Sequence, residues 1–173
     1  GYGHEFKKPG EFTKGYVYSY LMNNNFRTNF KNTQVSDSIF RYSITTHKGD
    51  WQEGLPHQFG WAFHNPLFPV YIEGKKEGNL SSSYSFCQVN QTNILLLTLK
   101  KAEDGKGIIA RLIETQGKDT EAMVEFPFIN IGKAYQTNLV EENERLLAIE
   151  KHTVRVSIKA YGVTTIRILT DWK

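Results

Sequence analysis

The sequence lacks several features that would assign it to a particular class of protein. It holds a single cysteine, Cys87, so no internal disulfide can form. No run is apolar enough to span a bilayer, because the longest, residues 94–97, falls far short of the roughly 20 residues that a membrane helix needs. We therefore expect no membrane as a partner of this chain.

An excess of charge of one sign is also lacking. The 21 lysine and arginine residues nearly balance the 18 aspartate and glutamate residues, which leaves a net charge of +3. The basic residues are dispersed, as in the pair Lys100-Lys101 with Glu103 close by, and do not form the stripe typical of nucleic-acid-binding proteins. We expect no nucleic acid as a partner.

Motifs for catalysis and metal binding are scarce. The histidines do not have the close, repeated spacing of zinc ligands; the five are His4, His47, His57, His64 and His152. Most carboxylates lie in hydrophilic turns, where solvated acids are usual, and Cys87 lies in a strand-like segment where a buried structural thiol is usual. We predict no catalytic residue, no metal site and no cofactor within this chain.

Strand-forming residues are what the sequence does contain. Aromatic residues make up 13% of it, and they favour strands. The clearest pattern is residues 153–159, where Val154, Val156 and Ile158 alternate with polar residues and are predicted to face inward. Similar patterns predict strands at 16–22, 39–46, 59–63, 68–72, 94–99, 108–114, 121–126, 129–136 and 163–169.

Turn signals between these segments indicate how they are arranged. Asp104-Gly105-Lys106-Gly107 lies between two strand-like runs and predicts a hairpin. Many short strands with turns between them predict an all-β fold, an antiparallel β-sandwich in a single domain, with long loops between roughly residues 47 and 83. We expect residues 1–15 to be a leader or linker and residues 16–173 to form the sandwich domain.

One polar segment, residues 22–30, is a candidate binding site. It combines asparagines with Phe26, Arg27 and Phe30 directly after a predicted strand. Amide groups can donate to and accept from sugar hydroxyls, and an aromatic ring can pack on a sugar face. The same asparagines are equally suited to forming turns, so the residue chemistry leaves both readings open.

The sequence also resembles a known family. Residues 24–30 (Asn-Asn-Phe-Arg-Thr-Asn-Phe), 40–43 (Phe-Arg-Tyr-Ser), 59–67, 97–107, 109–114 (Ile-Ala-Arg-Leu-Ile-Glu) and 159–167 are similar, in this order, to the C-terminal region of bacterial family 38 glycoside hydrolases. The resemblance covers most of the chain. It implies a parent enzyme of the α-mannosidase type, retaining, with a zinc ion and an aspartate nucleophile in a catalytic domain.

The resemblance implies a non-catalytic β-domain that supports the catalytic domain and flanks its carbohydrate site. The implied partners are that catalytic domain and mannose-containing glycans, and the implied substrate-binding residues are Asn24, Phe26, Arg27, Thr28, Asn29 and Trp51. An independent carbohydrate-binding module is the alternative, with Phe26, Trp51 and Trp61 as its candidate aromatics. An unrelated hydrolase or lyase would need a clustered pair of carboxylates or a His-centred site in the loop region, and the sequence shows no such cluster. Cytoplasmic and periplasmic locations both stay open.

Overall fold

β-forming residues become strands only where a neighbouring strand takes up their backbone hydrogen bonds. The computed structural model describes residues 15–22, 33, 35–74, 77–78 and 80–170, and the chain divides into two units, 1–44 and 45–173. The described residues of the first unit are exposed and contain no helix or strand. The predictions of strands at 16–22 and 39–46 are therefore wrong, because neither segment belongs to either of the two sheets that the described residues form. The predicted domain boundary after residue 15 stays a prediction.

One short helix, α1 (Pro56–His64), lies in the region predicted to form loops. Pro56 occupies the start of the helix, where its fixed φ is favourable and its missing N–H is not needed. The prediction of a strand at 59–63 is wrong, because these residues lie in α1, and 68–72 also form no strand. No helix in the described residues is long and apolar enough to cross a membrane.

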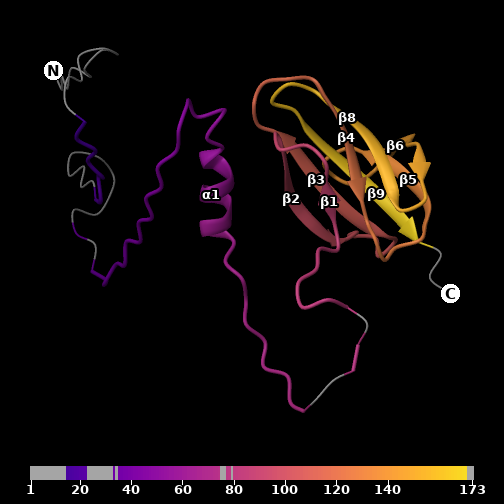
Figure 1. Ribbon diagram of the computed structural model, residues 1–173, viewed down its shortest axis with the longest axis horizontal. Helices are drawn as coiled ribbons and strands as arrows, with labels where there is room; N and C mark the ends of the chain where they lie inside the picture. Colours follow the sequence, from indigo (N-terminus) through magenta and orange to yellow (C-terminus); the bar gives the residue numbers. More distant parts are fainter. Residues whose placement is uncertain (1–14, 23–32, 34, 75–76, 79, 171–173) are drawn as a thin grey trace. The chain divides into compact units, whose positions relative to one another are not determined.

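The sandwich itself occupies residues 88–170 (Figure 1). A four-stranded antiparallel sheet has the order β1-β4-β8-β7, and a five-stranded antiparallel sheet has the order β2-β3-β9-β5-β6. The strands are β1 (Gln88–Val89), β2 (Ile94–Lys101), β3 (Ile108–Glu114), β4 (Thr120–Glu125), β5 (Ile131–Thr137), β6 (Asn143–Leu146), β7 (Ile149–Glu150), β8 (Thr153–Ile158) and β9 (Val163–Thr170). The all-β sandwich is confirmed, together with the six longest strands predicted in its sequence.

The hydrophobic core lies between the two sheets. Val154, Val156 and Ile158 of β8 face it, as their alternation predicted, and meet Ile166 and Ile168 of β9 from the other sheet. Cys87 packs against this core just before β1, and its burial raises the pKa of the thiol to about 11. That thiol is therefore protonated and unreactive at neutral pH.

The connections between the sheets gather at the two ends of the sandwich. The links β1–β2, β3–β4 and β8–β9 each pass from one sheet to the other, and their residues meet around Glu114. At the other end lie the β2–β3 hairpin and the β4–β5 link. β4 runs from one of these ends to the other. Its first residue, Thr120, pairs with Ile158 at the Glu114 end, and its last residue, Glu125, pairs with Thr153 at the opposite end.

The predicted hairpin at residues 104–107 joins β2 to β3, and two of its glycines have positive φ. Gly107 has a φ of +88°, and a Cβ there would lie 2.2 Å from the carbonyl oxygen of Ile168 in β9. Gly105 has a φ of +77°, but a Cβ there would meet only the end of the flexible Lys101 side chain, at 3.8 Å. The close approach of the hairpin to β9 thus depends on Gly107.

Gly107→Ala is expected to destabilise the sandwich by about 3 kcal/mol. The positive φ is unfavourable for alanine, and its Cβ would clash with the carbonyl oxygen of Ile168. Gly105→Ala is the matched control and is expected to cost only about 1 kcal/mol, since it carries the φ penalty without the clash. Urea unfolding followed by far-UV circular dichroism measures both values. Equal losses for the two variants would show that the approach to β9 is not the constraint.

Candidate functional site

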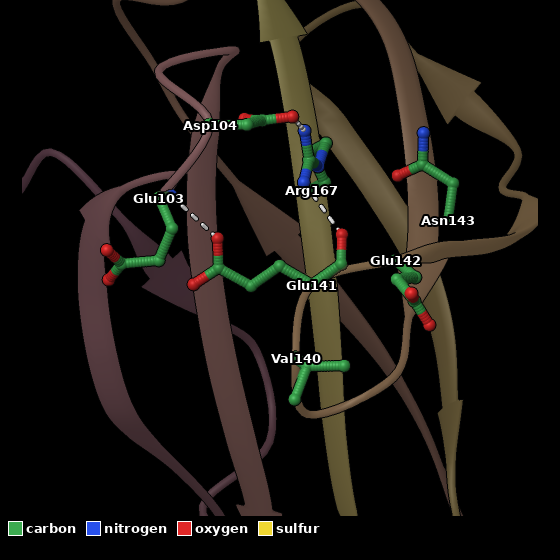
Figure 2. A pocket seen from close by; sticks show the side chains of 7 residues that line it. All are labelled: Glu103, Asp104, Val140, Glu141, Glu142, Asn143 and Arg167. Carbon is green, nitrogen blue, oxygen red and sulfur yellow. Dashed lines mark hydrogen bonds and ion pairs between the residues drawn. The ribbon is translucent and has the colours of Figure 1, made fainter.

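The outer face of the five-stranded sheet carries a polar pocket of about 430 Å³ (Figure 2). Its lining comes from the β2–β3 hairpin, the link between β5 and β6 together with the first residue of β6, and the central strand β9. The lining residues are Glu103, Asp104, Val140, Glu141, Glu142, Asn143 and Arg167. Because these segments are far apart in the sequence, only the folded sheet brings them together.

Arg167 of β9 lies at the centre of this pocket. It is only 6% exposed, although it points away from the hydrophobic core. Nη1 donates to Asp104 Oδ2 at 2.7 Å and to the Lys106 carbonyl at 3.2 Å, and Nη2 donates to the Glu141 carbonyl at 2.7 Å. The guanidinium therefore fastens both the hairpin and the β5–β6 link to β9.

Glu141 completes the pocket from the β5–β6 link. Its φ of 69° is unusual for a residue with a side chain, and its carboxylate is almost buried. Oε2 accepts from the Glu103 N–H at 2.8 Å and Oε1 lies 2.8 Å from Lys100 Nζ, which also pairs with Glu103. Figure 2 shows this carboxylate reaching from the link toward the hairpin side of the pocket.

The pocket's charges determine which chemistry it can support. The Lys100 ammonium and the Glu103 N–H lower the pKa of Glu141, and the Arg167 guanidinium and the Lys106 N–H lower the pKa of Asp104. A glycosidase acid/base needs a carboxyl group whose pKa is raised, so that it carries a proton to donate. Both carboxylates are ionised at neutral pH and are suited to holding the fold or accepting hydrogen bonds.

A second buried carboxylate, Glu114, lies at the opposite end of the sandwich and is fully buried. Oε1 accepts from Asn93 Nδ2 and the Gln116 N–H, both at 2.8 Å. Oε2 accepts from three further backbone N–H groups, those of Gly117 at 2.7 Å, Tyr161 at 2.9 Å and Lys118 at 3.1 Å. These donors belong to the three links that cross between the sheets at this end of the sandwich.

The pKa of Glu114 records the balance between burial and hydrogen bonding. Burial alone raises the pKa, but the hydrogen bonds, led by those from the Tyr161 and Gln116 N–H groups, outweigh it and lower the pKa to about 2. The ionised carboxylate is thus the form that the fold requires. Glu114 holds the crossing links together and has no proton to contribute to catalysis at neutral pH.

The segment that includes the start of α1 contacts the sandwich near Glu114. Gln52 and Gln116 exchange two hydrogen bonds, each from a side-chain amide to the other's carbonyl, at 3.0 and 2.9 Å. His57 Nε2 lies 3.1 Å from Thr115 Oγ1, and Gln58 Nε2 donates to the Thr92 carbonyl at 3.0 Å. Trp51, next to Gln52, is 48% exposed in a turn.

Most of the predicted substrate-binding residues cannot be compared with these sites. Asn24, Phe26, Arg27, Thr28 and Asn29 lie outside the described residues. Trp51 is described and lies half-exposed in a turn next to Gln52. The predicted absence of a metal site stays a prediction for the whole chain, but the described residues contain no group of three or more His, Cys, Asp or Glu side chains that could hold a metal ion.

Sequence reasoning missed Arg167, Asp104 and Glu141, and it treated Glu114 as a strand end. A signal was present in β9, where one arginine interrupts the apolar run Ile166-Arg167-Ile168 and must find a partner when both faces of the strand are covered. No comparable signal marks Glu141, whose neighbours Glu142 and Glu144 give the whole stretch the character of a solvated turn.

The chain is similar in sequence to known proteins. Residues 93–166 match the family model described as "Glycosyl hydrolases family 38 C-terminal beta sandwich domain". The chain is also 24% identical over 137 residues to "Alpha-mannosidase G" of Dictyostelium discoideum, an alignment that covers 76% of this chain and 12% of that protein. The family resemblance predicted from the sequence is confirmed, and the chain spans about one eighth of the length of this relative.

Acid is expected to destabilise the sandwich through Glu114. Because its pKa falls from 4.5 to about 2 on folding, its contribution to stability is complete above about pH 4.5 and is lost as the pH falls toward 2. Glu114→Gln is expected to cost about 3 kcal/mol at pH 7, since an amide nitrogen would face backbone donors.

Urea midpoints of the wild type and Glu114→Gln between pH 7 and pH 2 test this prediction, with the exposed Glu121→Gln as the control. The gap between wild type and Glu114→Gln is expected to narrow as the pH falls through this window. A gap that stays constant with pH would contradict the role assigned to the carboxylate.

Arg167→Lys is expected to destabilise the fold by about 2 kcal/mol although the charge is kept. A lysine ammonium is a point donor and cannot reach Asp104 and the two carbonyl groups together. The matched control is Arg155→Lys on the exposed face of β8, which is expected to change stability by less than about 0.5 kcal/mol. Urea unfolding at pH 7 measures the stability of both variants. If Arg167→Lys changed stability as little as Arg155→Lys, the three hydrogen bonds of the Arg167 guanidinium would not be needed for the fold.

Proposed function

Because residues 93–166 match the family 38 β-sandwich domain, we propose that this chain is a non-catalytic accessory domain of an α-mannosidase-like glycoside hydrolase. Its role is to support the catalytic domain of the parent enzyme and to flank the site where that domain holds its glycan. The match, which extends from just before β2 into β9, is the observation that carries this proposal. The name of the Dictyostelium relative supports mannose as the sugar.

The chemistry of the described carboxylates supports a non-catalytic role. Glu114, Asp104 and Glu141 are each tied to backbone or cationic donors that hold them ionised. The parent enzyme is proposed to be a retaining hydrolase with a zinc ion and an aspartate nucleophile. The described residues of this chain do not fit a zinc site, so the ion and the nucleophile would belong to the parent's catalytic domain.

The glycan-flanking part of the proposal concerns the segment after residue 22 and Trp51. Asn24, Arg27, Thr28 and Asn29 would supply amide, guanidinium and hydroxyl groups to sugar hydroxyls, and Phe26 and Trp51 would supply ring faces. The half-exposed indole of Trp51 supports this role. An independent carbohydrate-binding module stays the alternative, because exposed aromatic rings serve both functions.

The supporting role is tested in the full-length parent enzyme. Glu114→Gln weakens the sandwich, so it is expected to lower the temperature at which hydrolysis of an aryl α-mannoside is lost, with KM unchanged at lower temperature. Glu121→Gln is expected to leave that temperature unchanged. The purified 173-residue chain is expected to show no hydrolysis.

Either of two results would contradict the proposal. Inactivation of the full-length enzyme at the same temperature with and without Glu114→Gln would mean that the sandwich does not support catalysis. Hydrolysis by the isolated chain that persists through repurification would mean that the chain is itself an enzyme.

A further inference from the structure

Three aromatic rings form a cluster at the edge of the four-stranded sheet. Tyr84 and Phe86 lie in the segment just before β1, and Phe128 lies in the link from β4 to β5. The ring centroid of Phe128 is 4.4 Å from that of Tyr84 and 5.6 Å from that of Phe86, and the remaining pair is 6.0 Å apart. The cluster therefore forms one continuous aromatic surface, which we call the aromatic triad.

The triad is placed to face water and not the core. Tyr84, Phe86 and Phe128 are 43%, 57% and 47% exposed, whereas Phe126, two residues before Phe128, is completely buried. With about 200 Å² for each side chain, roughly 300 Å² of aromatic surface stays in contact with solvent. An exposed apolar patch of this size on a small domain is commonly a binding site.

The size of the triad favours a small ligand over a docked protein. A stable protein interface buries roughly 800 Å² on each partner, and the triad offers less than half of that. The tilts between its rings, 42° and 49° about Phe128, give a faceted surface and not a flat one. One or two sugar rings can rest on such facets through their C–H faces.

The segments that carry the triad have few charged side chains, which favours a neutral, hydroxyl-rich ligand. Residues 80–99 contain no acidic, basic or histidine side chain, and neither do residues 126–132. Two titratable residues lie beside these segments in the fold, Glu125, which pairs with Gln88, and His152, whose Nδ1 lies 2.8 Å from the Ile129 carbonyl oxygen.

Serines 81, 82, 83 and 85 stand beside Tyr84 and Phe86 in the sequence. The hydroxyls of Ser81 and Ser85 donate to the carbonyls of Ser83 and Cys87, so their oxygens are left to accept from a ligand. Aromatic rings supply stacking area at little entropic cost, and hydroxyl groups supply adaptable hydrogen bonds.

We propose that the aromatic triad of Tyr84, Phe86 and Phe128 is a binding surface for a neutral oligosaccharide. Sugar rings stack on the exposed ring faces, and hydroxyl groups of the serine-rich segment bond to the sugar. The triad lies at the end of the sandwich opposite Glu114, because β4 begins beside the Glu114 links and Phe128 follows its other end. This site deepens the proposed function, and it rests on that function only for mannose as the first sugar to test.

The experiment is calorimetric titration of the whole 173-residue chain with α-mannobiose and α-mannotriose, and with cellotriose and maltotriose to test the sugar class. Wild type is expected to bind at least one of them with a Kd of roughly millimolar order. Phe86→Ala and Phe128→Ala are expected to weaken binding on the order of tenfold. Phe128→Tyr keeps the ring and is expected to bind like wild type.

Tyr71→Ala is the matched control, since Tyr71 is an exposed aromatic residue outside the triad. The unfolding midpoint of each variant is measured beside its titration, so that a variant that fails to fold is recognised. If Phe128→Ala does not fold, the comparison of Phe86→Ala with Phe128→Tyr decides the outcome. Equal affinity in wild type and Phe86→Ala would overturn the proposal, as would the absence of binding to all four sugars.

Sedimentation of the same proteins separates a sugar site from a protein interface. If wild type binds no sugar but self-associates through the triad, the proposal is wrong and the triad is a protein-docking surface. The titration uses no catalytic domain, so its failure leaves the supporting role intact. Conversely, failure of the thermal inactivation test leaves sugar binding by the triad untouched.

Discussion

The buried carboxylate of Glu114 is the constraint on which the sandwich depends. A sandwich needs its chain to cross between sheets, and each crossing leaves backbone N–H groups without strand partners. At one end of this protein three crossings converge, and the ionised Glu114 accepts from the side chain of Asn93 and from backbone N–H groups in the other two. The cost of burying the charge is offset by these bonds, which is why its pKa falls although burial alone would raise it.

On the outer face of the five-stranded sheet a buried charge is again offset by hydrogen bonds, but here the charge is positive. Arg167 is buried on the solvent side of β9 and uses carbonyl groups and Asp104 to fix two links over the sheet. The charged groups of the polar pocket are therefore already paired with one another or with the backbone. The aromatic triad is different, because its rings pack on one another and leave about half of their surface in water. A binding function fits the unpaired surface better than the paired one.

Sequence patterns predicted the sandwich more reliably than they predicted its sites. Strands such as β8, with Val154, Val156 and Ile158 facing inward, follow from alternation that is local and visible. The segments 16–22 and 39–46 have equally suitable residues but belong to neither sheet of the described residues, and Pro56 starts a helix where aromatic residues suggested a strand. Of the predicted binding residues, Trp51 is exposed in a turn, and the asparagine segment lies outside the described residues.

By itself, the sequence determined the fold class, the positions of the long strands, the hairpin before Gly107 and the likeness to family 38. Each of these depends on residues that are close together in the chain or on an ordered set of short motifs. Only the tertiary structure decided which polar and aromatic residues meet. Glu114 reaches Tyr161, Arg167 reaches Asp104, and Tyr84 reaches Phe128 because strand pairing and sheet stacking bring them together. Such contacts depend on register and topology in space, and no spacing along the chain encodes them.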